Sequence, residues 1–247
     1  MTRTTKTLLA GVAGLILTAA SAHASTIYQH SFGGSDGVNL LGTGVDIDNN
    51  GGSNTWSGST GSFDADGSVD GEGSHGVWLP FSPTSGNIYQ LSGSIDYASG
   101  AWITLGFANG NPDNHFNSIP AEPYGSVLVN AGVTTFDGQG LNGPNGHAAV
   151  SGFNDVDIVL DATDANSANW TVAFYLEGAL VSGPSTITNS GTWPATGDLD
   201  RIQYVGFSTS SASGTIDDFA LTIIPEPGSL ALMSLGGLLI TRRRRGN

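Results

Sequence analysis

Carboxylates are the side chains of this sequence best suited to chemistry, and one pair of them stands inside an apolar run. Asp217 and Asp218 are adjacent in "GTIDDFALTII", near the end of the chain. Neighbouring residues of a strand face opposite sides, so we expect one carboxylate to point inward, where it is costly unless paired. Because calcium prefers oxygen ligands, the sequence predicts a structural calcium ion at Asp217 or Asp218. Arg201 or backbone N–H groups are the alternative partners.

A second acidic group lies in "DADGSVDGE" and offers the same kind of ligand. It consists of Asp64, Asp66, Asp70 and Glu72. The alternative is a hairpin turn whose acids are solvated. The segment 46–51, "DIDNNG", begins like an EF-hand loop, but Ser57 stands at the twelfth position in place of the bidentate Glu. We therefore do not expect an EF-hand.

The sequence shows no clear catalytic pair. Glycoside hydrolysis needs two carboxylates about 5 to 10 Å apart. The glutamates of the body, Glu72, Glu122 and Glu177, are isolated from one another. Asp157 and Asp161 in "VDIVLDA" differ in spacing and residue type from a hydrolase acid pair carried on one strand. The histidines of the body have no zinc-ligand spacing; they are His30, His75, His115 and His147. We expect a protein that is not an enzyme, with a carbohydrate-active enzyme of unrecognised acid pair as the alternative.

Sugar recognition is the binding chemistry that the aromatic side chains permit. Proteins stack exposed aromatic rings on sugar faces and use amides and carboxylates for the hydroxyls. The candidates in or near expected loops are Trp102, Trp193, Tyr124, Phe116 and Asn114. Each is equally suited to a buried core, so the sequence selects no binding face.

The body of the chain reads as β-structure throughout. Short runs of Val, Ile, Thr and aromatic residues alternate with clusters of Gly, Asn, Asp and Ser, and no three-turn helical period occurs. Five Trp and ten Phe supply a core and argue against disorder. The predicted strands are "STIYQHSF", "GVWLPF", "NIYQLSGSIDY", "AWITLGFA", "GSVLVN", "VDIVLDA", "NWTVAFYLEG", "IQYVGFST" and "GTIDDFALTII". They predict a single antiparallel β-sandwich or jelly roll over residues 25–224.

Three local features accompany these strands. The alternation in "NIYQLSGSIDY" is imperfect, which predicts a β-bulge at Gly93. The stretch "FYLEGALVSG" predicts a hairpin with Glu177 and Gly178 at its tip. The segment 33–76 is the least apolar part of the body, and we expect a long loop region there.

The charge distribution excludes several partners. The 247 residues contain 21 Asp and Glu against 7 Lys and Arg, and Arg201 is the one basic residue between Lys6 and Arg242. Such a body repels nucleic acid and anionic lipid headgroups, whose binding needs Lys and Arg. The absence of Cys excludes disulfides and thiolate metal sites.

The N-terminal 24 residues are typical of a secretory signal peptide. Arg3 and Lys6 precede an apolar run, and "AHA" places small residues before a cleavage site between Ala24 and Ser25. We expect signal peptidase to remove this segment, a helix in the membrane. An anchor helix that stays attached is the alternative.

The C-terminal residues 225–247 combine a proline motif, a short apolar run and a cationic end. Pro225, Glu226 and Pro227 precede about 13 apolar residues, too few for a spanning helix of roughly 20. The positive-inside rule keeps the final cluster in the cytoplasm; it consists of Arg242, Arg243, Arg244 and Arg245. A weak membrane anchor is one interpretation.

In its order of parts this tail resembles the PEP-CTERM sorting signal. The resemblance implies recognition by an exosortase, an integral-membrane protease of Gram-negative bacteria that make extracellular polysaccharide. It also implies a hydrophobic helix that anchors the protein transiently in the inner membrane. Removal of the tail near the Pro-Glu-Pro motif then delivers the protein to the outer surface or the extracellular matrix.

The body resembles the concanavalin A-like lectin and glucanase sandwich in its laminin-G-like form. Three segments carry this resemblance: "IYQLSGSIDYASGAWITLGFA", "NDVDIVLDATDANSANWTVAFYLEGALV" and "IQYVGFSTSSASGTIDDFALT". Glucanases of that family carry Glu-x-Asp-x-(x)-Glu on one strand, a pattern from which this chain departs. We therefore expect an exported envelope or matrix protein that binds a glycan, such as extracellular polysaccharide, and touches membrane only through its terminal segments. A purely structural matrix protein is the further alternative.

Overall fold

A computed structural model describes most of the body of the chain. The described residues are 24–32, 39–58, 63–65, 69–71, 75–97, 102–109, 122–130, 133–137, 146–147, 154–185, 202–209 and 214–225. Residues His23–Glu226 form one compact unit.

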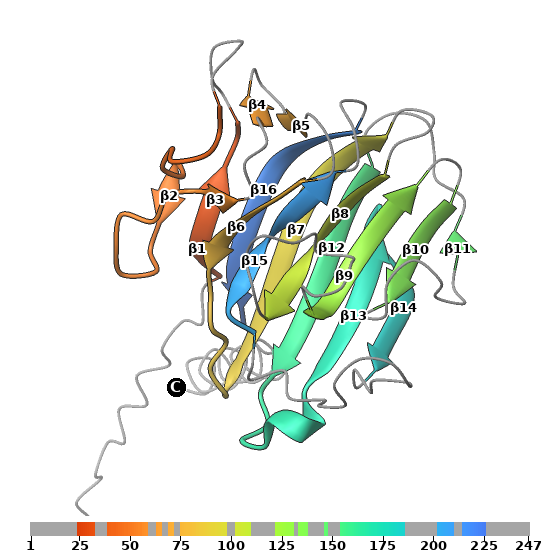
Figure 1. Cartoon of the computed structure of the whole chain (residues 1–247). Coiled ribbons are helices and arrows are strands. Elements are labelled where there is room, and N and C mark those ends of the chain that lie inside the picture. Colours follow the sequence, from red (N-terminus) through yellow and green to blue (C-terminus); the bar gives the residue numbers. More distant parts are fainter. Residues whose placement is uncertain are drawn as a thin grey trace, which may run out of the picture. The chain divides into compact units, whose positions relative to one another are not determined.

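The described strands build two antiparallel sheets that face each other (Figure 1). The first sheet follows the order β14 (Ala179–Ser185), β13 (Thr171–Leu176), β12 (Asn154–Ala162), β7 (Asn87–Tyr97), β16 (Gly214–Ile224), β1 (Ser25–His30) and β2 (Ile47–Asp48). In the same sheet β5 (Val69–Gly71) pairs with β16, and β4 (Phe63–Ala65) pairs with β5. The second sheet follows the order β11 (Gly146–His147), β10 (Val133–Asp137), β9 (Glu122–Asn130), β8 (Trp102–Asn109), β15 (Tyr204–Thr209), β6 (His75–Pro80) and β3 (Ser57–Gly58).

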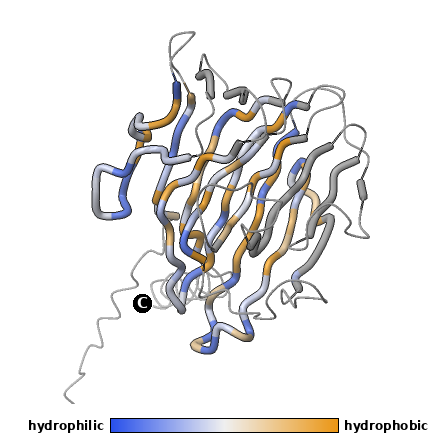
Figure 2. The backbone as a smooth tube through the Cα atoms, in the orientation of Figure 1, coloured by the Kyte–Doolittle hydropathy of each residue, from blue (hydrophilic) through white to orange (hydrophobic). Residues whose placement is uncertain are grey.

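The core lies between the two sheets and is filled by the inward half of each strand's alternation. In β12, for example, Val156, Ile158 and Leu160 are buried while the residues between them are not. The hydropathy of the strands alternates accordingly in Figure 2. From the second sheet, Leu105, Phe107, Val205 and Phe207 join the same core.

These pairings confirm the predicted antiparallel two-sheet sandwich. Each of the nine predicted strands coincides with an observed strand. The hairpin is also confirmed, because β13 pairs with β14 and its tip residues Glu177 and Gly178 both have positive φ, 50° and 72°. Such a two-residue turn matches the twist of the flanking strands. In the segment 33–76, which we expected to be a long loop region, the described residues form the short strands β2 to β5, of two or three residues each, before β6 begins at His75.

The β-bulge lies in a different strand from the one predicted. β7 pairs continuously with β12, with Gly93 opposite Val156. The register shift instead falls in β16, where Asp218 and Phe219 together lie opposite Gly93. Asp218 has φ of 52°, a left-handed conformation that Asp tolerates better than most residues. The glycine serves close packing instead, because a Cβ at Gly93 would lie 3.1 Å from Ile216 Cδ1 and 3.2 Å from Leu105 Cδ2.

The two ends of the described body meet in the first sheet. Ser25 lies opposite Ile223 in the pairing of β1 with β16, so the predicted signal cleavage site and Pro225 lie at the same end of neighbouring strands. The predicted terminal helices and the rest of the sorting signal, Glu226, Pro227 and Arg242 to Arg245, lie outside the described residues. Among the described residues, no helix has the length and apolar character needed to span a membrane.

Candidate functional site

The outward side of the first sheet carries a concentrated set of partly exposed polar side chains, which we call the polar face. The alternation that buries Val156 and Ile158 turns the residues between them outward. The polar face consists of Gln90, Ser92 and Ser94 on β7, Asp155, Asp157 and Asp161 on β12, and Thr171 and Tyr175 on β13.

Asp157 lies at the centre of the polar face and is held by the neighbouring strand. Its Oδ1 accepts hydrogen bonds from Gln90 Nε2 at 2.8 Å and from Ser92 Oγ at 2.6 Å. Among the described residues, no group donates to Oδ2. On the other side, Tyr175 of β13 lies directly opposite Asp157, which places the two Cβ atoms about 5 Å apart. A fixed acceptor therefore lies beside an aromatic ring on a partly exposed surface.

A second carboxylate on the polar face is held in a similar way. Asp155 Oδ1 accepts a hydrogen bond from Ser94 Oγ at 2.9 Å. The backbone N–H of Asp155 donates to Glu177 Oε1 at 2.8 Å, and the backbone N–H of Glu177 donates to the Asp155 carbonyl at 2.9 Å. These two bonds tie the β13–β14 turn to the start of β12 at one end of the polar face.

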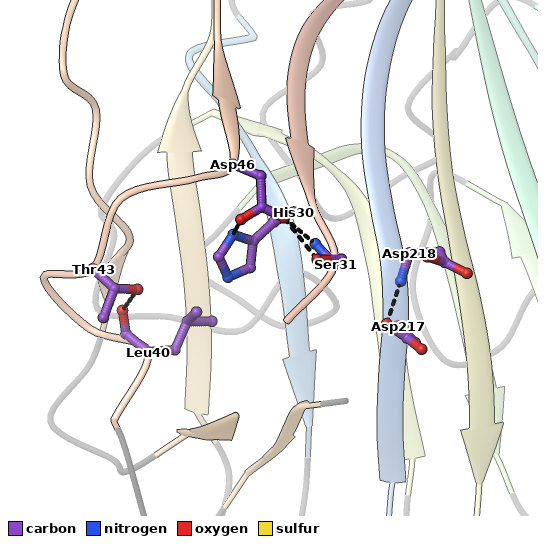
Figure 3. A network of polar contacts seen from close by, with 7 residues as sticks. All are labelled: His30, Ser31, Leu40, Thr43, Asp46, Asp217 and Asp218. Atoms are coloured by element: carbon purple, nitrogen blue, oxygen red, sulfur yellow. Dashed lines mark hydrogen bonds and ion pairs between the residues drawn. The ribbon is translucent and has the colours of Figure 1, made fainter. Parts of the chain in front are cut away.

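Neither of the predicted calcium ligands on β16 points into the core. The bulge adds one residue between Ile216 and Phe219, which are both fully buried. The expectation of an inward carboxylate is thus wrong, because strict alternation does not hold here: Asp217 is only partly buried and Asp218 is exposed. The Asp218 N–H donates to Asp217 Oδ1 at 2.8 Å (Figure 3). Partial burial nevertheless raises the pKa of the Asp217 carboxyl above its ordinary value.

The described residues contain no group of three or more His, Asp or Glu side chains placed to hold a metal ion. Asp64 lies on β4 opposite Asp70 of β5, and its side chain, like the whole of Asp66, lies outside the described part. Calcium binding therefore stays a prediction. Its signature would be a melting temperature that falls on addition of EDTA.

The acids of the EF-hand-like segment are occupied by hydrogen bonds within the chain. Asp48 accepts from the backbone N–H groups of Asn50 and Asn54 and from the Asn54 side chain. Desolvation is the largest single influence and raises the pKa of the Asp48 carboxyl, but the hydrogen bonds of Asn54 and Asn50 together outweigh it, so the pKa is lowered. The segment is thus a turn that is closed by its own hydrogen bonds and pairs with β1 through β2.

His30 and Asp46 form a second polar contact at the same edge of the first sheet (Figure 3). Asp46 Oδ2 accepts from the backbone N–H and the hydroxyl of Ser31, both at 2.8 Å, and these bonds lower the pKa of its carboxyl. His30 Nδ1 lies 3.6 Å from Asp46 Oδ1. Burial lowers the pKa of His30, although the charge of Asp46 opposes the shift. The His30 ring packs edge-on against Phe32, with centroids 4.7 Å apart.

The outward side of the second sheet differs, and we call it the buried outer face. Its residues Trp78, Ala108 and Tyr204 pack together, with the two rings 6.4 Å apart, and Trp78 is only 4% exposed. Beside them, Thr104 Oγ1 and Ser208 Oγ share a hydrogen bond of 2.5 Å and are fully buried. Trp78, Ala108, Thr104 and Ser208 are therefore shielded from solvent, whereas Tyr204 is partly exposed.

The residues proposed for sugar stacking from the sequence lie outside the described side chains. Trp102 and Tyr124 belong to β8 and β9, but nothing of their side chains is described, nor of Trp193, Phe116 or Asn114. The sequence reading missed Tyr175 as a site residue, although its outward position in "NWTVAFYLEG" was readable. It also missed Gln90 and Ser92, which lie 67 and 65 residues before Asp157.

Comparisons with known proteins establish no family for this chain. No family model and no curated protein matches it. Among solved structures, the Emp47p carbohydrate recognition domain is 12% identical, with a TM-score of 0.44 and coverage of 80% of this chain and 96% of that one. A pseudo beta-1,3-glucanase of Mycobacterium tuberculosis is 12% identical, with a TM-score of 0.41 over 82% and 100% of the two chains. The VIP36 lumenal domain in its Ca2+/Man3GlcNAc-bound form is 10% identical, with a TM-score of 0.38 over 69% and 85%. At these TM-scores the likenesses decide neither family nor function.

Proposed function

We propose that this protein is an exported, non-enzymatic β-sandwich that binds a polysaccharide on its polar face. One observation carries the proposal: the Asp157 carboxylate is oriented by Gln90 and Ser92 and lies beside the partly exposed ring of Tyr175. A carboxylate oxygen accepts hydrogen bonds from sugar hydroxyls, and an aromatic ring offers an apolar surface with a polar tip. A concanavalin A-like relationship is part of this proposal.

Charge selects the class of polysaccharide. The described residues include no Lys or Arg, and the polar face carries Asp155, Asp157 and Asp161. An anionic sugar, such as a uronic acid, would be repelled and would find no Lys or Arg partner among the residues that the structure describes. The ligand is therefore an uncharged polysaccharide, whose binding changes little with salt because no counterions are released.

The terminal segments supply the location. We propose that signal peptidase cuts after Ala24 and that an exosortase removes the tail at the Pro-Glu-Pro motif, which leaves the body in the envelope or extracellular matrix of a Gram-negative bacterium. An acidic surface without Cys suits such a place, because it remains soluble and does not depend on redox conditions.

A glycan array tests the binding site with a matched pair of variants. Asp157→Asn removes the charged acceptor, whereas Asp218→Asn makes the same change on an exposed residue of the same sheet. A hydrogen bond to a charged group contributes about 1.5–3 kcal/mol, so we expect Asp157→Asn to weaken binding about ten- to a hundredfold and Asp218→Asn to leave it unchanged. Binding of uronic-acid polymers alone, or of no glycan, would contradict the proposal; the latter would favour a purely structural matrix protein.

One observation favours a hydrolase as the second candidate. Asp155 and Asp157 face outward from one strand at a two-residue spacing, so their Cα atoms are about 6.6 Å apart, and their carboxyl groups can reach a comparable separation. Inverting glycosidases hold their carboxyl groups about 6.5–9.5 Å apart. Release of reducing sugar from the producer's own polysaccharide, abolished by Asp155→Asn, would establish this activity and overturn the non-enzymatic proposal.

A further inference from the structure

The last described strand ends directly before the predicted sorting motif. β16 ends at Ile224, and Pro225 follows directly outside the strand. Proline has no backbone N–H and cannot extend the ladder. The first residue of the motif thus marks where the sheet ends, and no linker separates the two.

The last residues of β16 are held on both sides. On one side, Thr222, Ile223 and Ile224 pair with Gln90, Tyr89 and Ile88 of β7. On the other side, Thr222 and Ile223 pair with Thr26 and Ser25 of β1. Just before them, Leu221 is fully buried in the core. Freeing this end of β16 therefore requires that two ladders open and that core contacts are lost.

A protease can cleave only backbone that enters its cleft. Peptides bind to such clefts as extended strands through their main-chain hydrogen bonds, and the main chain of Ile223 and Ile224 already pairs within the sheet. We propose that the membrane protease cuts the tail on the C-terminal side of Pro225, so that the mature chain keeps at least this proline. This inference depends on the proposed export and tail removal. It adds that the first peptide bond the protease can cleave is the one after Pro225.

The intact mass of the mature protein, isolated from the producing cells, tests this limit. We expect a chain whose last residue is Pro225 or a later residue. A chain that is cut but ends at Ile224 or earlier would overturn this inference alone. An uncut tail would overturn the proposed sorting together with this inference, so the two failures are distinguishable.

A four-residue glycine–serine insertion between Ile224 and Pro225 sharpens the test, because it frees the backbone upstream of the motif. If the cut lies beyond Pro225, the mature protein gains the whole insert and still ends at the same motif residue. Cleavage within the insert would show that the protease cuts upstream of Pro225 once the backbone there is unpaired, which supports the pairing of β16 as the upstream limit. A mature chain that still ends at Ile224 or earlier would overturn the inference. The same insertion between Glu177 and Gly178, at the tip of an exposed hairpin, is the matched control and should leave the C-terminal residue unchanged.

Discussion

The polar face of the first sheet and the buried outer face of the second are both produced by two-residue alternation, yet they carry different side chains. The first presents Asp157, Ser92 and Tyr175 in partly exposed positions. The second presents Trp78 and the Thr104–Ser208 pair, all of them buried. The comparison teaches that an outward direction in a sandwich does not amount to exposure, and that aromatic residues on the two faces have different roles.

Removal of one aromatic ring from each face should reveal the difference between the two faces most strongly. Trp78→Ala leaves a cavity in a buried cluster, and we expect a loss of about 3–5 kcal/mol in the free energy of unfolding. Tyr175→Ala, on the polar face, should cost about 1 kcal/mol or less while it weakens glycan binding. Urea denaturation of both variants measures the difference, and equal losses of stability would contradict the distinction between the faces.

The hydroxyl pairs of the two faces give a smaller contrast. Thr104→Val keeps the shape of the side chain but deprives buried Ser208 of one partner, which should cost about 1–3 kcal/mol. Ser94→Ala breaks the bond to exposed Asp155, where water replaces the lost partner, and should cost about 0.5 kcal/mol or less. Chemical denaturation at constant pH compares them; a larger loss for Ser94→Ala would refute the assignment of the exposed face.

Tyr28, which points inward from the first sheet, sharpens the comparison with outward Tyr175. Its hydroxyl donates to the Pro80 carbonyl of the second sheet at 2.7 Å and accepts from Asn50 Nδ2 at 2.6 Å, so Tyr28→Phe should cost about 1 kcal/mol. Burial raises the pKa of Tyr28 from 10.0 to about 12.

A raised pKa means that the neutral phenol is favoured in the folded state. The stability that the folded protein gains from neutral Tyr28 is complete below pH 10 and disappears as the pH rises towards 12. Thermal unfolding followed over this range should show a shallower alkaline decline for Tyr28→Phe than for the wild type. Parallel declines would show that Tyr28 does not titrate with unfolding.

The smallest effect is expected from His30, at the edge of the first sheet. Burial lowers its pKa, so the neutral imidazole is favoured in the folded state, and stability should decline as the pH falls below its ordinary value of about 6.5. His30→Phe, which keeps a ring beside Phe32, should lose less stability between pH 7.5 and pH 5. Within this window Asp46 remains ionised, and identical slopes for both proteins would contradict the assignment.

The sequence predicted the strands better than their register. Alternation and turn residues located the nine main strands and the Glu177–Gly178 turn, because both signals are local. The bulge in β16 could not be read, since it depends on Asp218 adopting a left-handed conformation opposite Gly93, a choice made by packing against the neighbouring strand. That single extra residue is why the predicted orientation of Asp217 and Asp218 was wrong.

The candidate site illustrates the same limit. The sequence singles out Asp157 only as a carboxylate whose spacing to Asp161 does not match a hydrolase, although its outward direction follows from the alternation alone. Its partners Gln90 and Ser92 come from a strand more than sixty residues earlier, and only the pairing of β12 with β7 brings them together. Long-range contacts of this kind depend on strand order, which local patterns do not contain.

The pairing of Ser25 with Ile223 also determines how the body responds to force. Because the two ends leave from the same edge of adjacent antiparallel strands, tension between them peels β1 from β16 and loads the hydrogen bonds one after another. Each bond contributes only about 1 kcal/mol, so β1 should separate from β16 at low force. A body tethered at both ends would open like a zipper, whereas a body held at one end alone would never bear that load.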